Sequence, residues 1–393
     1  MNMNNKNWVS VWGNAVSIAE HHPEAYAKYI TLRYPVYIPF DGDTLRFTFD
    51  NYCGSEAVTV TRATVSAATS PVYEKMPLAC PCKKETICDI TFSKNESVTM
   101  EAHQTAVSDP VSFPVKKGMT LTVSLYFADF TLMQSAVLVT GPLSKGFFSL
   151  GDQTHADALP MDTTKTTNWF YFLSNIELMT AEENHTVICY GDSITAGAWP
   201  DYLTLLAKQN PDNHTAFIRR ATSGSRVLRQ YECITYDSYG LKGTNRFPHE
   251  IPTTGADTVI IQQGINDIIH PIGIETNPFR PMSDLPTAKE LIDGYRYYIE
   301  EAKKLHLKVY MGTLLPIFGW RTYATFRDDL RNELNAWIRS AKEIDGCIDF
   351  DLALRGSENP SAFREVFDSG DHLHPSSKAY QAMAECAYEV LRK

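Results

Sequence analysis

The sequence lacks the long apolar runs and the excess of positive charge that would suggest a membrane or nucleic-acid function. No stretch approaches the ~18 apolar residues that are needed to span a bilayer. The formal net charge of −10 argues against a nucleic-acid partner and against a polybasic, membrane-binding surface. The N-terminus has no charged region followed by a continuous apolar core, so no signal peptide is visible. We expect a cytoplasmic protein, or a secreted one if a leader has been removed.

Patterns for cofactor and metal binding are also missing. Nothing resembles a Walker loop or a GxGxxG turn. The eight cysteines are scattered, and two of them, Cys189 and Cys347, fall in apolar runs, which is typical of a reducing compartment. Cys80, Cys82 and Cys88 lie close together, but their spacing does not match the paired CxxC of zinc sites. We therefore expect neither a metal nor a cofactor.

The hydrophobic pattern divides the 393 residues into two halves near residue 180, which predicts two domains. In the first half, short segments of period two are separated by turn signals, so we expect an antiparallel, jelly-roll-like β-sandwich over residues 1–180. Residues 17–28 are an exception and read as a short helix or a loop. The expected strands are 29–40, 44–52, 57–68, 85–92, 96–102, 119–127 and 131–141.

In the second half, residues 181–393, strand-like runs alternate with helical patterns. Such alternation predicts an α/β domain in which a parallel sheet is covered by helices on both faces, a three-layer αβα arrangement. The expected strands are 186–190, 214–220, 256–262, 307–313 and 347–351, and the expected helices are 201–209, 287–305, 326–342 and 376–391.

Four polar blocks follow strands of this second half: GDSIT with Ser193, ATSGSRVL (221–228), QQGINDI (262–268) and FDSGDHLHP (367–375). Because they follow parallel strands, we expect them to converge on one edge of the sheet. A serine at a strand-to-helix turn suits a nucleophile, because backbone N–H groups there can stabilise an oxyanion. A helix N-cap is the ordinary alternative for a single such serine.

The four blocks resemble those of the SGNH (GDSL) hydrolase superfamily, esterases that use a serine in a GDS turn. The segment CIDFD, the ALR that follows it, and DSGDHLHP are similar to a subgroup of arylesterase-like acylhydrolases that includes rumen and gut bacterial proteins linked to xylan breakdown. The segments Trp8–Gly13 and TLRFTFDNYCG are loosely similar to the N-terminal region of such proteins.

The resemblance implies a catalytic triad and an oxyanion hole. Ser193 would be the nucleophile, His374 the general base and Asp371 the residue that orients the imidazole. The oxyanion hole would consist of the N–H groups of Ser193 and Gly224 and the side-chain amide of Asn266. The second block reads ATSG where many relatives have Asn-Ala-Gly, so Gly224 is assigned by order.

Several positions stay open. His372 competes with His374 for the role of base, although the family pattern Asp-x-x-His-Pro favours His374, which precedes Pro375. Possible pocket residues are Asp192, Trp199, Arg226, His270 and His372, and Trp320 is a further candidate. Core packing or solvated charge explains each of these equally well.

The expected function is serine-dependent hydrolysis of short acyl esters, most plausibly acetyl esters on plant polysaccharide or oligosaccharide. One alternative is a lipase or thioesterase of the same superfamily. Another is a carbohydrate-binding protein whose hydrolase half is inactive.

Overall fold

The computed structural model describes residues 6–19 and 25–392. The chain forms two compact units, residues 1–186 with 211–218 and residues 187–210 with 219–393. The change of hydrophobic pattern near residue 180 falls shortly before the first dividing point. Each unit is described separately below.

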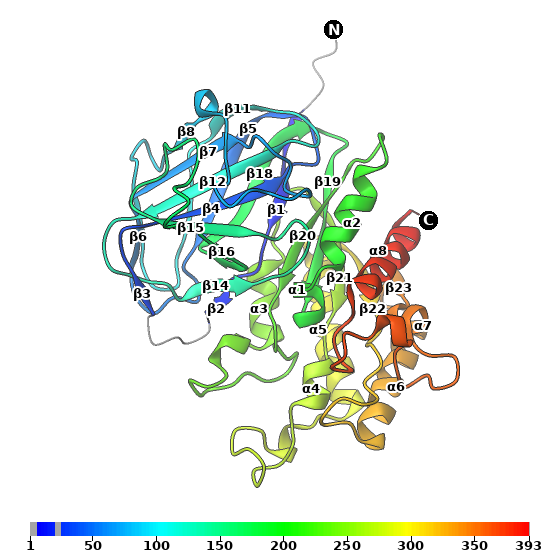
Figure 1. Ribbon diagram of the computed structural model, residues 1–393. Helices are drawn as coiled ribbons and strands as arrows, with labels where there is room; N and C mark the ends of the chain where they lie inside the picture. Colours follow the sequence, from blue (N-terminus) through cyan, green and yellow to red (C-terminus); the bar gives the residue numbers. More distant parts are fainter. Residues whose placement is uncertain (1–5, 20–24, 393) are drawn as a thin grey trace. The chain divides into compact units, whose positions relative to one another are not determined.

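The first unit is built from antiparallel sheets (Figure 1). One large sheet has the order β1-β18-β5-β10, with β11 also pairing with β5, and the other has the order β16-β15-β4-β12-β7-β8. The strands of the first are β1 (Lys6–Gly13), β5 (Gly42–Asp50), β10 (Thr105–Val107), β11 (Val111–Val115) and β18 (Leu173–Ala181). Those of the second are β4 (Ile30–Tyr37), β7 (Arg62–Ala67), β8 (Cys88–Ile90), β12 (Thr120–Phe127), β15 (Gly146–Leu150) and β16 (Lys165–Thr167).

Three small sheets complete this unit: β13-β3, β17-β14-β2 and β6-β9. Their strands are β2 (Ser17–Ile18), β3 (Tyr26–Ala27), β6 (Val58–Val60), β9 (Val98–Met100), β13 (Thr131–Leu132), β14 (Ser135–Leu138) and β17 (Trp169–Tyr171). Every residue of β12 is buried, so this strand is covered on both faces. The antiparallel, β-rich character predicted for the first half is confirmed.

A five-stranded sheet of order β20-β19-β21-β22-β23 belongs mainly to the second unit, and only the first residues of β19 and β20 are assigned to the first unit. Its strands are β19 (His185–Gly191), β20 (Thr215–Ala221), β21 (Ala256–Gln262), β22 (Lys308–Gly312) and β23 (Gly346–Ile348). The pairs β21–β22 and β22–β23 are parallel. Residues 186–191 of β19 are all buried, as expected for a strand with helices on both faces. The predicted α/β class is confirmed.

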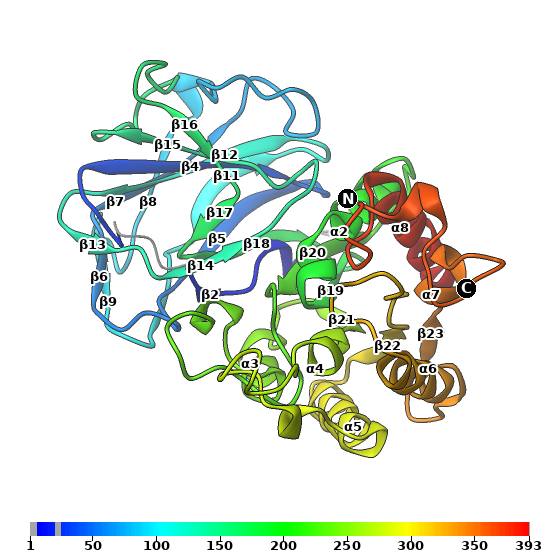
Figure 2. The same cartoon turned by 60° about the horizontal axis from the view of Figure 1, so that its bottom comes forward.

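Helices cover this sheet in two groups (Figure 2). On one side α2 (Trp199–Lys208) packs against α8 (Ser377–Leu391), and on the other α5 (Ala288–Lys304) packs against α3 (Gly243–Glu250) and α6 (Thr325–Ser340). Three short helices, α1 (Ser193–Ala196), α4 (Ile265–Ile269) and α7 (Phe350–Leu354), follow β19, β21 and β23. The strand order places the carboxyl ends of β19, β20 and β21 side by side, where open α/β sheets hold their ligands.

Three sequence expectations need correction. The strand predicted over 347–351 ends at Ile348, because Asp349 caps α7 by accepting the N–H of Leu352. In the segment 17–28, the described residues contribute the short strands β2 and β3 instead of a helix, and residues 20–24 lie outside the described part. The predicted strands of the first half also omitted β1, β10, β11 and β15 to β18.

The cysteine-rich stretch belongs to the core of the first unit. Cys80 is fully buried in a cluster with Met76, Phe147 and Leu159. Its carbonyl oxygen accepts a hydrogen bond from the buried guanidinium of Arg33 at 3.2 Å. All eight cysteines are free thiols, and among the described residues no group of histidine, cysteine and acidic side chains is arranged to hold a metal. Within the same residues, no helix has the length and apolar character of a membrane span.

Candidate active site

Ser193 lies directly after β19, in the turn that leads into α1. Asp192 is the N-cap of this helix, because its carboxylate accepts the N–H of Ile194 at 3.0 Å. The capping role considered for Ser193 therefore belongs to its neighbour. As the first residue of the helix, Ser193 has an N–H group without an intrahelical acceptor, and its side chain is half-buried. Both features suit a nucleophile next to an oxyanion site.

Three side chains from two distant parts of the chain meet in one hydrogen-bonded line. His374 Nε2 lies 3.0 Å from Ser193 Oγ, and His374 Nδ1 lies 2.6 Å from Asp371 Oδ2. Partial burial opposes ionisation of Asp371, but hydrogen bonds from the His374 ring and from the N–H groups of His374 and Leu373 outweigh it. They hold the pKa of this carboxyl at about 2. Asp371 is therefore a carboxylate at neutral pH.

The loop that carries Asp371 and His374 is a tight turn. Asp368 and Pro375 form an isolated antiparallel bridge, and the N–H of Ser369 donates to the carbonyl of His374 at 3.2 Å. Ser376 then caps α8 by accepting the N–H of Ala379. The turn brings the carboxylate of Asp371 against the ring of His374, three residues later in the chain.

Gly224 and Asn266, the predicted oxyanion donors besides Ser193, each have an N–H hydrogen without an acceptor among the described residues. Gly224 has φ +77, and a Cβ at this position would lie 2.3 Å from the Tyr239 ring, so only glycine fits. Within the described residues, the Gly224 N–H has no hydrogen-bond acceptor. Asn266, in α4, uses one amide hydrogen for the carbonyl of Ser225 at 3.1 Å, which leaves its second hydrogen for a ligand.

Buried polar contacts fix these loops against one another. Arg246 donates to the carbonyl of Gly191 at 2.9 Å and to Thr222 Oγ1 at 3.1 Å, joining the ends of β19 and β20. The carboxylate of Asp267 accepts the N–H groups of Val227 and Leu228 at 2.8 and 3.0 Å. Burial raises the pKa of Asp267 to about 6, while these two bonds favour its charged form.

The comparison with protein families agrees with this arrangement. Residues 189–382 match the profile of the GDSL-like lipase/acylhydrolase family. This part of the chain belongs to that family. The matched residues begin within β19 and end within α8, so they include every block of the candidate site.

Solved structures to which this chain is similar include a GDSL-like lipase from Bacteroides thetaiotaomicron. It is 20% identical, with 54% of this chain and 89% of that chain covered and a TM-score of 0.40. A variant of the acetyl xylan esterase Axe2 from Geobacillus stearothermophilus is 17% identical, with 53% and 95% covered and a TM-score of 0.40. No match to the sequence was found among curated proteins.

Two of the suggested pocket residues of this GDSL-like domain are core residues. Trp199 has no exposed surface, donates to Thr195 Oγ1 and packs against Phe350 with ring centroids 5.6 Å apart. Asp192 also has no exposed surface, and burial raises its pKa to about 7. Neither side chain reaches solvent.

The other suggested pocket residues differ in burial, and only His372 is exposed. Arg226 is almost fully buried and pairs with Asp284 at 3.1 Å. His270 follows α4 and is 7% exposed. His372 is exposed, bonds to Asp368 Oδ2 through Nδ1 at 2.5 Å and lies against Gly319. The structure thus brings His374, and not His372, to Ser193.

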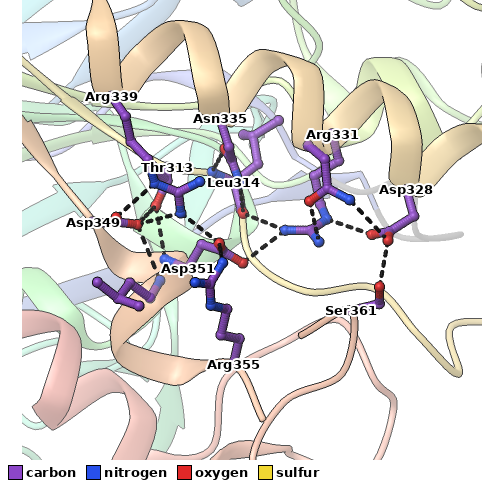
Figure 3. Close-up of polar contacts among 12 residues, drawn as sticks. Thr313, Leu314, Asp328, Arg331, Asn335, Arg339, Asp349, Asp351, Arg355 and Ser361 are labelled. Carbon is purple, nitrogen blue, oxygen red and sulfur yellow. Dashed lines mark hydrogen bonds and ion pairs between the residues drawn. The ribbon is translucent and has the colours of Figure 1, made fainter. Parts of the chain in front are cut away.

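Trp320 lies beside the candidate base, with its ring centroid 6.5 Å from that of His374. It belongs to the segment that follows β22, and a network of buried charges holds the start of this segment (Figure 3). Arg331 donates to the carbonyl of Leu314 at 3.2 Å while pairing with Asp328 and Asp351, each at 2.8 Å. Asp328 also accepts the Ser361 hydroxyl, and the Ser361 carbonyl accepts the N–H of Phe318 at 2.8 Å.

Sequence reasoning missed two residues near the site, Tyr239 and Arg280. Tyr239 lies on Gly224 and stacks on His270, and Arg280 is a buried arginine close to Tyr236. No local motif marks either residue, because both lie between the motif blocks, Tyr239 at the end of a short 3-10 helix (Asp237–Tyr239) and Arg280 in a loop. Asp267, in contrast, follows Asn266 directly in the third block and could have been assigned a loop-holding role.

Proposed function

We propose that the protein is a serine esterase that hydrolyses short-chain acyl esters, namely acetyl esters of plant polysaccharides or oligosaccharides, through an acyl-enzyme. The observation that carries this proposal is the 3.0 Å separation of His374 Nε2 and Ser193 Oγ, together with the Asp371 carboxylate on the other ring nitrogen. The acetyl and carbohydrate parts of the proposal rest on the sequence resemblance alone.

The proposed reaction has two steps. The Ser193 hydroxyl attacks the ester carbonyl while His374 Nε2 takes its proton, and Asp371 stabilises the imidazolium. The N–H groups of Ser193 and Gly224 and the free amide hydrogen of Asn266 stabilise the negative oxygen. Collapse of this intermediate breaks the ester C–O bond, and the imidazolium protonates the departing alcohol. Water, activated by the same imidazole, then releases the acid and restores the serine.

The decisive test is a Ser193→Ala variant assayed with p-nitrophenyl acetate. We expect turnover to fall by about 10³-fold or more, because the attacking oxygen is lost. Ser340→Ala is the matched control, since this serine hydroxyl bonds only within α6, to the carbonyls of Ala336 and Trp337. Retained activity in the Ser193 variant would exclude it as the nucleophile.

A series of p-nitrophenyl esters of increasing chain length separates the acetylesterase from the lipase or thioesterase alternative. A maximum at acetate supports the carbohydrate esterase, whereas a maximum at long acyl chains supports the alternative. Binding of acetylated xylan to the full-length Ser193→Ala variant tests the carbohydrate-binding alternative.

A further inference from the structure

A buried arginine without a counter-ion lies near the candidate oxyanion site. Arg280 is 7% exposed, its buried Nε has no hydrogen-bond partner, and its guanidinium forms no ion pair within the described part of the chain. Its guanidinium carbon lies 4.4 Å from the ring centroid of Tyr236 and 5.8 Å from that of Tyr231. Buried charges are normally paired, because removing an unpaired charge from water is costly. This arginine therefore points to a missing anionic partner.

Aromatic rings connect Arg280 with the oxyanion donors. The Tyr239 ring covers Gly224 and stacks on His270, with centroids 5.3 Å apart. The ring centroids of Tyr231 and Tyr236 lie 5.7 and 5.6 Å from the ring centroid of Tyr239. These rings form a continuous layer from the oxyanion glycine to the arginine. The Tyr231 hydroxyl and His270 Nδ1 are buried and lack hydrogen-bond partners among the residues described.

A second arginine approaches from the segment that carries Trp320. The Arg321 guanidinium lies over the Trp320 ring at 4.5 Å, and this ring neighbours His374. Thr322, the next residue, donates to the carbonyl of Ile269 at 3.0 Å, which brings the segment beside His270. Arg321 is exposed and forms no ion pair with any described residue.

Positive charge exceeds negative charge around Arg280 and His270. Burial, followed by the charges of Arg280, Arg226 and Arg321, lowers the pKa of His270 well below its ordinary value. Asp284 offsets part of this charge, because it pairs with Arg226 at 3.1 Å and lies 3.9 Å from Arg229. The whole chain has a net charge of −10, so a local excess of arginine does not follow from composition.

We propose that the preferred ester substrate carries a carboxylate, and that Arg280, assisted by Arg321, binds it. This inference rests on the proposed esterase function. A planar guanidinium matches a carboxylate through two parallel hydrogen bonds, and stacking on tyrosine holds it in a fixed orientation. The carboxylate could belong to the alcohol half, as in an acetylated uronic acid, or to the acyl half, as in a dicarboxylic half-ester. The shared chemistry is a negative charge attached to the ester.

The test compares matched esters that differ only in this charge. One pair is acetylated methyl glucosiduronate and its uncharged amide, which places the carboxylate in the alcohol half. The other pair is phenyl hemisuccinate and phenyl succinamate, which places it in the acyl half. We expect kcat/KM to be about 10- to 100-fold higher for the charged member of one pair, as expected for a charge-assisted hydrogen bond, and the preference to shrink with added salt.

Variants then assign this preference to the arginines. Arg280→Gln should remove it by lowering turnover of the charged ester while leaving turnover of the uncharged one, and Arg280→Lys should retain part of it. Arg321→Gln changes an exposed side chain, so it tests the same charge without disturbing buried packing, and we expect a loss of about 2- to 5-fold. Arg392→Gln is the matched control, because Arg392 also lies over a tyrosine ring but at the opposite end of α8 from the site.

The two levels of the proposal fail differently. Hydrolysis of the uncharged esters that depends on Ser193 but shows no preference for a carboxylate would overturn this inference and leave the proposed function standing. Equal losses for charged and uncharged esters in Arg280→Gln and Arg321→Gln would also overturn it. Absence of hydrolysis of every ester would overturn the proposed function, and this inference with it.

Discussion

One loop of this protein contains two aspartate–histidine pairs of nearly identical construction. In each, one carboxylate oxygen accepts the backbone N–H of the paired histidine and the other meets the histidine Nδ1. The first pair is Asp368 and His372, and the second is Asp371 and His374. Only the second histidine reaches the serine hydroxyl, at 3.0 Å. Pairing with a carboxylate therefore does not by itself make a histidine a general base.

Backbone conformation separates the two pairs. His372 has φ +65, in the left-handed region, and its ring lies against Gly319, where a Cβ would be 2.8 Å from the imidazole. His374 follows two residues later, outside the left-handed region, and its ring faces Ser193. The bend at His372 turns the two side chains in different directions. The pair that includes His372 holds the loop, and the pair that includes His374 is placed for chemistry.

Replacing each histidine by alanine should give the largest contrast. We expect His374→Ala to lower kcat for p-nitrophenyl acetate by about 10³-fold or more, because the proton acceptor is lost. His372→Ala should change kcat by about threefold or less, because its ring has no contact with Ser193. Similar losses in both variants would show that the two histidines act together.

Replacing each aspartate by asparagine should give a smaller contrast of the same sign. We expect Asp371→Asn to lower kcat by roughly 10²- to 10⁴-fold, because an amide favours the wrong tautomer of His374. Asp368→Asn should leave kcat near that of the parent enzyme. The pH profile of kcat/KM adds a readout for positioning: its acid limb should move in the Asp371 variant only. An unchanged profile in that variant would argue against the orienting role.

Local motifs were enough to predict much of the sheet domain and its site. The blocks containing Ser193, Gly224, Asn266 and His374 each follow a strand, and the order of parallel strands brings them to one edge. The resemblance to the SGNH family also assigned Asp371, which precedes His374 by three residues. These features depend on residues close together in sequence or on a common strand topology, so they can be predicted from sequence patterns.

Other features depend on packing between distant segments and left no such pattern. Trp199 was a candidate pocket residue from the sequence, but it packs against Phe350 and is completely buried. Arg280 and Tyr239 lie between the motif blocks, and their relation to Gly224 arises only from the folded arrangement of three loops. The end of β23 was predicted too late, because residues 347–351 look like one strand in the sequence although Asp349 caps helix α7.

The smallest expected contrast concerns stability and tests the bend at His372. A residue other than glycine with φ near +65 carries a cost of about 1–2 kcal/mol, which glycine avoids. We therefore expect His372→Gly to be more stable than His372→Ala by about 1 kcal/mol, as measured by urea unfolding. The exposed helical residue Lys378 is the matched control, and there glycine should be less stable than alanine by a similar amount. If His372→Ala were more stable than His372→Gly, the left-handed backbone at residue 372 would not explain why the rings of His372 and His374 point in different directions.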